Sequence, residues 1–383
     1  MPDATPRRIL YYCQSLVGIG HLTCSLRIIE RLLEHAEVDL IHGGLDAGTP
    51  APRAGFRSLR LPTLLHDEET GGFVDPHAGR DAAAVWPERE RAIAGFLRMP
   101  YHAVVVEFYP FGRRRFKPEI QALLRAVRER SGPVPVFTSV REVLVPRAVE
   151  QERRMVDTVR KHIHTVFVRG DPDVIRLDET FSLAPEIAAC LCYTGYISPP
   201  PPVGERPART RQIVVSQGGG DVGRELLEAA IDAAPLMPGH AFVLAAGART
   251  PPAALDALRR RVRSANVEIV PFLADFPRRL MASAASISMG GDNTLLDVLA
   301  AGTPGLAYPY QGNVEQAIRI RRFAAKGLLH ELGPQDLAPP RLKRRIETAL
   351  CAPAPAHRLA MDGARVTSER IRHVLAHAPL RSP

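Results

Sequence analysis

One stretch near the C-terminal end constrains the fold of this chain more than any other. Residues 285–304 read ASISMGGDNTLLDVLAAGTP. A short apolar run is followed by a Gly-Gly corner and then by apolar residues at helical spacing, and the pattern stops at Gly-Thr-Pro. The stretch therefore predicts a β-strand, a tight turn and a short helix.

The turn in this stretch has the properties of an anion site. Gly290 and Gly291 let the backbone turn sharply and let a ligand approach with no Cβ in the way. The first amides of the following helix lack partners within the helix, and such a terminus binds anions, phosphate above all. Asp297 lies about one turn inside the helix, where a carboxylate suits a pair of ribose hydroxyls. The alternative is an ordinary corner of an α/β domain with no ligand.

Asp292 is the one residue at this turn that argues against a bound diphosphate. An ionised side chain pointing into the turn would repel the phosphates. We expect Asp292 to cap the helix instead, since Asp is a favoured N-cap residue.

A second strand and loop follow directly. Residues 305–310 read as an apolar strand, and the loop after it leads into a helix that begins near Glu315 and Gln316. In a doubly wound sheet, the loops that leave the carboxyl ends of adjacent strands line the same crevice. We therefore expect Glu315 and Gln316 beside the glycine turn.

These features together resemble the donor-binding half of GT-B glycosyltransferases, above all the MurG-like branch, which uses UDP-sugars. The resemblance rests on the Gly-rich turn, the acidic residue inside the helix, the Ala-Ala-Gly-x-Pro run at 300–304, and the Glu-Gln pair. It covers the C-terminal half well, and the N-terminal half only at a Gly-x-Gly-His turn. It implies an α/β fold of two Rossmann-like, doubly wound domains that face each other across a cleft.

The resemblance also implies roles for individual residues. Residues 291–294 would meet the diphosphate, Asp297 would hold the ribose where the family usually has Glu, and Glu315 with Gln316 would bind the sugar hydroxyls. The loop at 271–273 would lie where the nucleobase stacks. The residues implied for donor binding are Ser216, Gln217, Gly218, Gly219, Phe272, Gly290, Gly291, Asp292, Asn293, Thr294, Asp297, Glu315 and Gln316.

The length of the chain predicts two domains, because 383 residues exceed what one hydrophobic core usually organises. A proline run at 199–202 cannot join a helix or an inner strand and reads as a linker. We expect an N-terminal acceptor-binding domain at 1–197, the linker at 198–210 and a donor-binding domain at 211–353. The helix in 354–383 is expected to cross back to the first domain.

The overall composition is that of a globular protein, with 45% hydrophobic and 24% charged residues. The formal charge of +9 comes mostly from arginines spread along helices, which favours solvated helix faces over an anionic partner. Five widely spaced cysteines do not suit a disulfide scaffold. With no signal-peptide core and no apolar run long enough for a membrane span, we expect a cytoplasmic protein.

Candidate catalytic residues lie in the first half. The turn after the first strand ends in Gly20-His21, which places His21 at a helix N-terminus. A neutral imidazole there suits a general base, whereas the alternative is a histidine that only packs or caps. Glu107 ends an apolar strand, where functional side chains gather in open sheets, although an ion pair is an equal alternative. We count Gly20, Glu107 and Arg113 as acceptor-side residues, and Phe111 to Phe116 as a peripheral membrane contact if the acceptor is a lipid.

A second glycine loop opens the other half. The strand at 212–216 leads into Gln217 and three glycines, 218–220. Their amides are expected to face the phosphates, and Ser216 or Gln217 to reach the acceptor or the sugar. The alternative is a tight βα loop without a ligand.

The sequence as a whole predicts an inverting glycosyltransferase in which His21 deprotonates an acceptor that is a small molecule or lipid-linked. The helix terminus would offset the charge of the leaving diphosphate, so we expect no cofactor and no metal. Asp171-Pro172-Asp173 has the spacing of a magnesium motif, but its proline favours a turn. A sugar-nucleotide hydrolase or epimerase is the alternative. A nucleic-acid binder is disfavoured because no such module or stacking platform is present.

Overall fold

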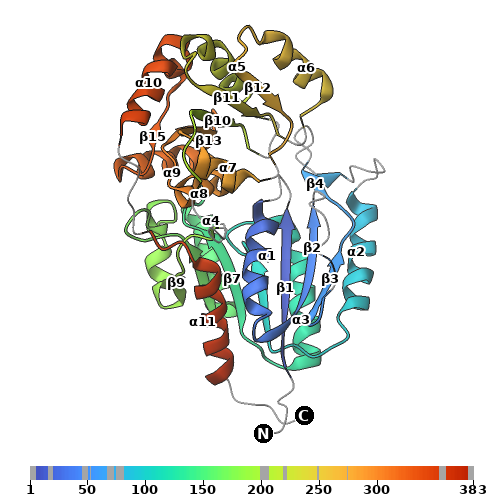
Figure 1. The fold of residues 1–383 in the computed structure, drawn as a ribbon. Coiled ribbons are helices and arrows are strands. Elements are labelled where there is room, and N and C mark those ends of the chain that lie inside the picture. The colour runs from blue at the N-terminus through green and yellow to red at the C-terminus, as the bar shows by residue number, and fades with distance from the viewer. Residues whose placement is uncertain are drawn as a thin grey trace. The chain divides into compact units, whose positions relative to one another are not determined.

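The computed structural model describes residues 6–15, 20–44, 51, 53–66, 73–74, 82–198, 207–218, 222–247, 250–273, 275–352 and 359–377. Contacts divide the chain into two compact units (Figure 1). Unit 1 comprises residues 1–172, 176–197 and 362–383, and unit 2 comprises residues 173–175 and 198–361.

Unit 1 is built on a parallel sheet of seven strands within the described residues, in the order β3-β2-β1-β6-β7-β8-β9. The strands are β1 (Arg7–Ser15), β2 (Ala36–Gly44), β3 (Phe56–Arg60), β6 (Ala103–Glu107), β7 (Val136–Arg141), β8 (Thr165–Arg169) and β9 (Leu191–Tyr193). The central strands β1, β6 and β7 are buried along most of their length because helices cover both faces of the sheet.

Two helix layers bury these faces. Helix α1 (Gly20–Leu32) and helix α11 (Gly363–His377) lie side by side on one face, where they pack on Tyr11, Val105 and Phe137 (Figure 1). Helices α2 (Ala82–Phe96), α3 (Lys117–Ser131) and α4 (Val149–His162) contribute to the core of the other face. The α11 segment, which closes the chain, therefore belongs to unit 1.

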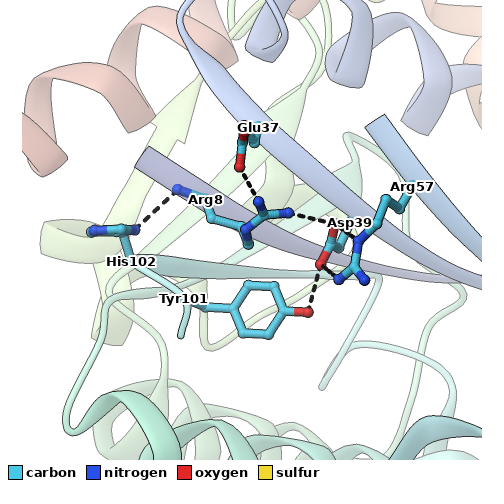
Figure 2. A network of polar contacts seen from close by, with 6 residues as sticks. All are labelled: Arg8, Glu37, Asp39, Arg57, Tyr101 and His102. Carbon is cyan, nitrogen blue, oxygen red and sulfur yellow. Dashed lines mark hydrogen bonds and ion pairs between the residues drawn. The ribbon is translucent and has the colours of Figure 1, made fainter. Parts of the chain in front are cut away.

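A polar network ties the strands of unit 1 together in the first half of β2. Asp39 is fully buried and accepts hydrogen bonds from Arg8 Nη1 at 3.1 Å, Arg57 Nε at 2.9 Å and the Tyr101 hydroxyl at 2.8 Å (Figure 2). Arg8 also pairs with Glu37. A buried carboxylate needs such partners, and here they come from three different segments of the unit.

Unit 2 repeats the pattern with a six-stranded parallel sheet among its described residues, in the order β12-β11-β10-β13-β14-β15. The strands are β10 (Gln212–Ser216), β11 (Ala241–Ala245), β12 (Val267–Val270), β13 (Ala285–Met289), β14 (Gly305–Tyr308) and β15 (His330–Glu331). The helices are α5 (Arg224–Ala233), α6 (Pro252–Arg261), α7 (Phe276–Ala282), α8 (Asp292–Ala301), α9 (Val314–Ala325) and α10 (Pro339–Cys351). Helices α5, α6 and α10 share one core with the sheet, and α7 and α8 share another.

Each sheet has a topological switch point, where successive strands stop adding on one side and begin to add on the other. In unit 1 it lies between β1 and β6, and in unit 2 between β10 and β13. Ligands of open α/β sheets bind at the carboxyl ends of the strands at such points. The loops after these four strands are therefore the first places to look for a site.

A short antiparallel pair of strands, β4 (Leu65–His66) with β5 (Phe73–Val74), lies outside the two parallel sheets. One sequence prediction needs correction. Phe111 and Phe116 are 2% and 0% exposed, so these two rings belong to the core and cannot contact a membrane. In the described part of the chain, no helix has the length and apolar character needed to span a membrane.

Candidate functional site

His21 and Glu107 meet at the switch point of unit 1. His21 is the second residue of α1 and Glu107 is the last residue of β6. The His21 Nδ1 atom lies 2.6 Å from Glu107 Oε1, and the two side chains are 12% and 0% exposed. The helix and the strand are far apart in the sequence, and the parallel pairing of β1 with β6 brings them together.

Two arginines hold the carboxylate of Glu107 from other directions. Arg169, the last residue of β8, places Nη2 3.3 Å from Glu107 Oε1. Arg113 places Nη2 3.8 Å from Glu107 Oε2, which is within ion-pair distance but beyond a hydrogen bond. The ion pair that was one alternative for Glu107 is therefore present. A functional role for this carboxylate stays a prediction.

The electrostatics favour a neutral histidine beside an ionised glutamate. Burial lowers the pKa of His21 from 6.5 to about 4, and although Glu107 acts against this, Arg141 and Arg113 add to it. Burial alone would raise the pKa of Glu107, but His21, Arg113 and Arg169 outweigh it and hold the pKa well below its usual value. A neutral imidazole that donates Nδ1–H to the carboxylate keeps the lone pair on Nε2. That nitrogen is then available as a general base.

The turn after β6 positions the residues around this pair. Phe108 and Arg113 both adopt left-handed backbone conformations, with φ of 65° and 58°. Such strain is held in place only where the surrounding structure requires it. The Phe108 ring lies edge-on to the His21 ring with centroids 5.3 Å apart, and the Arg113 guanidinium lies 5.8 Å from the same Phe108 ring.

The switch point of unit 2 brings the two predicted glycine turns together. Gly291 is the N-cap of α8, and Thr294 lies in the first turn of that helix. A Cβ on Gly218 would lie 3.9 Å from Thr294 Oγ1, and a Cβ on Gly291 would lie 4.0 Å from the same oxygen. The loop after β10 and the start of α8 are therefore neighbours, as a shared anion site requires.

Gly290 lets helix α9 pack against this turn. A Cβ on Gly290 would lie 2.5 Å from Ile320 Cδ1 and 3.0 Å from Gln316 Cβ. The Asn313 side chain caps α9 by accepting a hydrogen bond from the Gln316 amide at 3.0 Å. The side-chain oxygen of Gln316 accepts a hydrogen bond from the Tyr310 amide at 2.8 Å, which leaves its NH₂ group as the end that can donate to a ligand.

Other predicted donor residues also lie on the carboxyl side of this sheet. Asp297 is half-buried on α8, and Glu315 is half-buried in the first turn of α9. Phe272 follows β12 and is 64% exposed, as an aromatic ring must be if a base is to stack on it. Gly219 lies outside the described residues.

Two details of the predicted site are wrong. Asp292 is the first helical residue and Gly291 is the cap, because Gly291 already has the extended backbone of an N-cap. The Gly218 amide donates to Ser216 Oγ at 3.1 Å, so it is not available to a phosphate. Ser216 and Gln217 are 6% and 7% exposed, and Gln217 Nε2 donates to Thr250 Oγ1 at 3.3 Å. These side chains shape the turn, and their contact with a donor stays a prediction.

Sequence reasoning missed the arginines at the ends of β7 and β8. Arg141 and Arg169 each end an apolar strand, the same signal that singled out Glu107. That signal was applied to the acidic residue only. Across the described residues, no group of three or more His, Cys, Asp and Glu side chains is placed to hold a metal ion.

Comparisons with known proteins were made for the whole chain. No protein-family model matches it. The chain is 33% identical over 112 residues to the UDP-N-acetylglucosamine--N-acetylmuramyl-(pentapeptide) pyrophosphoryl-undecaprenol N-acetylglucosamine transferase of Nitrobacter hamburgensis, a match that covers 28% of this chain and 29% of that enzyme. It is 29% identical over 263 residues to the zeaxanthin glucosyltransferase of Pseudescherichia vulneris, covering 60% of this chain and 63% of that enzyme. The chain thus spans under a third of the first of these relatives and under two thirds of the second.

The structural comparison covers nearly all of the chain. The crystal structure of CalG4, the calicheamicin glycosyltransferase, matches 98% of this chain and 100% of its own with a TM-score of 0.63 and 18% sequence identity. At this identity the match speaks for the fold. Two Rossmann-like units with parallel sheets are the expected architecture, and the expectation is confirmed.

Proposed function

Because the chain has the fold of the GT-B glycosyltransferases, we propose that it transfers a sugar from a UDP-sugar to an acceptor hydroxyl with inversion at the anomeric carbon. The observation that carries this proposal is the contact of 2.6 Å between His21 Nδ1 and Glu107 Oε1 at the switch point of unit 1. The proposal draws its donor class from the similarity to a UDP-N-acetylglucosamine-dependent relative.

Unit 1 would supply the base. As the acceptor oxygen forms a bond to the anomeric carbon, its proton passes to His21 Nε2, and the bond between that carbon and the diphosphate oxygen breaks. The electron pair of the broken bond leaves with UDP. Glu107 accepts the Nδ1–H hydrogen bond, which fixes the tautomer and stabilises the imidazolium that forms.

Unit 2 would bind the donor. The amides at the start of α8, from Asp292 to Thr294, would bind the diphosphate and stabilise the charge that develops on it as it leaves. Asp297 would accept hydrogen bonds from the ribose hydroxyls. Gln316 and Glu315 would bind the sugar, and Phe272 would stack on the base. In this scheme the helix terminus does the work that a metal ion does in other transferases.

The test is a turnover assay that separates three products. Purified protein is incubated with UDP-glucose or UDP-N-acetylglucosamine, with and without a panel of hydroxylated acceptors, and UDP, free sugar and glycosylated acceptor are each quantified. The proposal expects UDP and glycosylated acceptor in equal amounts, lost in His21→Ala and retained in His377→Ala, which alters an exposed histidine on α11. Free sugar without glycosylated acceptor would indicate a hydrolase. No UDP from any donor would contradict the proposal.

A further inference from the structure

Among the described residues, the carboxyl edge of the unit 1 sheet carries more positive than negative charge around His21. Glu107 pairs in register with Ser139, and Arg141 pairs with Arg169. Side chains alternate along a strand, so Ser139 and Arg141 lie on the same face. This face is the one that α1 covers, because Val105 and Phe137, which lie on the same face of β6 and β7, form a core with that helix. It therefore carries Glu107, Arg141 and Arg169.

Glu142, the residue directly after β7, lies on the opposite face. A Cβ on Gly170 would lie 2.5 Å from Glu142 Cβ, which places Glu142 with Gly170 and away from Arg141. Asp171 follows directly after Gly170 and is counted with the edge. Among the described residues counted at this edge, three guanidinium groups, those of Arg113, Arg141 and Arg169, stand against the two carboxylates of Glu107 and Asp171. With His21 neutral, these five groups together carry one net positive charge.

Arg113 presents this extra charge in an unusual state. Its side chain is only 10% exposed, and Nη2 faces Glu107 Oε2 at the ion-pair distance of 3.8 Å, yet neither Nε nor Nη2 has a hydrogen-bond partner among the described residues. Leaving buried charged donors without hydrogen bonds is costly. These two N–H groups form the side-on edge of the guanidinium, which matches the two oxygens of a carboxylate.

The same chain shows what that edge does when a carboxylate is present. Arg89 binds Glu119 through Nε at 2.8 Å and Nη2 at 2.8 Å. Arg261 binds Asp232 through the same two atoms at 2.9 Å and 2.5 Å. The Arg113 edge lies beside His21 and Glu107, where the acceptor would bind if the proposed function holds.

We propose that the acceptor carries a carboxylate close to the hydroxyl that is glycosylated, and that Arg113 binds this carboxylate through Nε and Nη2. A single negative charge on the acceptor compensates the net positive charge of these five described groups. This assignment rests on the proposed function and specifies its acceptor as a hydroxy acid.

The experiment compares acceptors in which a carboxylate next to the hydroxyl is replaced by a neutral amide of the same shape. Turnover with mandelate is measured against mandelamide, and turnover with lactate against lactamide. The wild-type protein is expected to prefer the acid by about tenfold or more in kcat/KM, the amount that a charge-assisted, bidentate contact supplies. Arg113→Gln should abolish this preference, whereas Arg114→Gln, which alters the exposed neighbouring side chain, should preserve it. Equal use of acid and amide would overturn the assignment and leave the transferase function standing.

A binding measurement covers the case in which none of these acceptors is glycosylated. Histidine resonances of the ¹⁵N-labelled protein are followed during titration with benzoate and, separately, with benzamide. The His21 resonance is assigned as the one that is missing from the spectrum of His21→Gln. Benzoate should shift this resonance in the wild-type protein and benzamide should not. In Arg113→Gln, benzoate should leave it unshifted. If benzoate and benzamide act alike up to their solubility limits, no carboxylate site is present at Arg113. If the proposed transferase function is wrong, the turnover assay shows it separately, because no UDP is then released from any UDP-sugar.

Discussion

Replacing Glu107 with Gln tests the proposed base directly. The substitution keeps the size of the side chain but removes its charge, and the amide NH₂ can donate to His21 Nδ1. That hydrogen bond favours the tautomer with the proton on Nε2, which cannot act as a base. Since a positioned general base contributes about 10²- to 10⁴-fold, we expect kcat of E107Q to fall by a factor in that range.

The structure also predicts what E107Q should leave unchanged. Glu107 belongs to unit 1, and the predicted UDP-binding residues belong to unit 2, so UDP affinity should stay within about twofold. The fold should lose about 3 kcal/mol, because Arg169 keeps its burial and loses its carboxylate.

The assay is steady-state UDP release, with thermal unfolding and UDP titration of the same samples. Glu142→Gln is the matched control, because Glu142 is also buried and lies directly after the neighbouring strand β7, but it faces the other side of the sheet. E142Q should keep its kcat within a few-fold even if it is destabilised. The reasoning is refuted if E107Q keeps more than about a tenth of wild-type kcat, or if E142Q loses as much as E107Q does.

Four further predictions follow from single features. Since His21 acts as a base only when neutral, and burial lowers its pKa to about 4, kcat/KM should stay flat from neutral pH down to about that value; an acid limb near 6.5 would contradict the assignment. Gly290→Ala should destabilise unit 2 by about 1–3 kcal/mol in thermal unfolding, because the new methyl group meets α9 at 2.5 Å, whereas Gly291→Ala meets only a hydroxyl oxygen at 4.0 Å and should weaken UDP binding without loss of stability. Asp39→Ala should lower the free energy of unfolding in urea by about 3 kcal/mol, by removing the carboxylate at the centre of the network in Figure 2, and should leave kcat of the folded protein unchanged. Phe272→Ala should weaken UDP binding in calorimetry by about 1 kcal/mol and leave the unfolding temperature unchanged, because the ring is 64% exposed.

The sequence predicted local structure well because its signals are local. Strand, glycine turn and helix at 285–304 appear as β13, the turn at Gly290 and Gly291, and α8. Gly290 is required there for a reason that no local pattern contains, since its missing Cβ makes room for Ile320 on the next helix. The predicted cap at Asp292 was wrong by one residue. Gly291 has the extended backbone of an N-cap, so Gly291 is the cap and Asp292 is already helical.

The pairing of His21 with Glu107 could not be predicted from spacing. The two residues became separate candidates, one at a helix start and one at a strand end, and only the order of strands in the sheet makes them neighbours. The burial of Phe111 and Phe116 was missed for a related reason. Both lie in a polar, arginine-rich segment, and the turn after Glu107 directs them into the core.

The central claim is that unit 1 supplies the base and unit 2 binds the donor, so that the two functions separate by mutation. The most direct measurement is UDP affinity and turnover, determined side by side for wild-type protein, His21→Ala and Asp297→Ala. The account predicts that H21A binds UDP like the wild type and turns over at least a hundredfold more slowly, as expected for loss of a general base, while D297A binds UDP more weakly. A wild-type protein without UDP affinity, or an H21A variant with wild-type turnover, would contradict it.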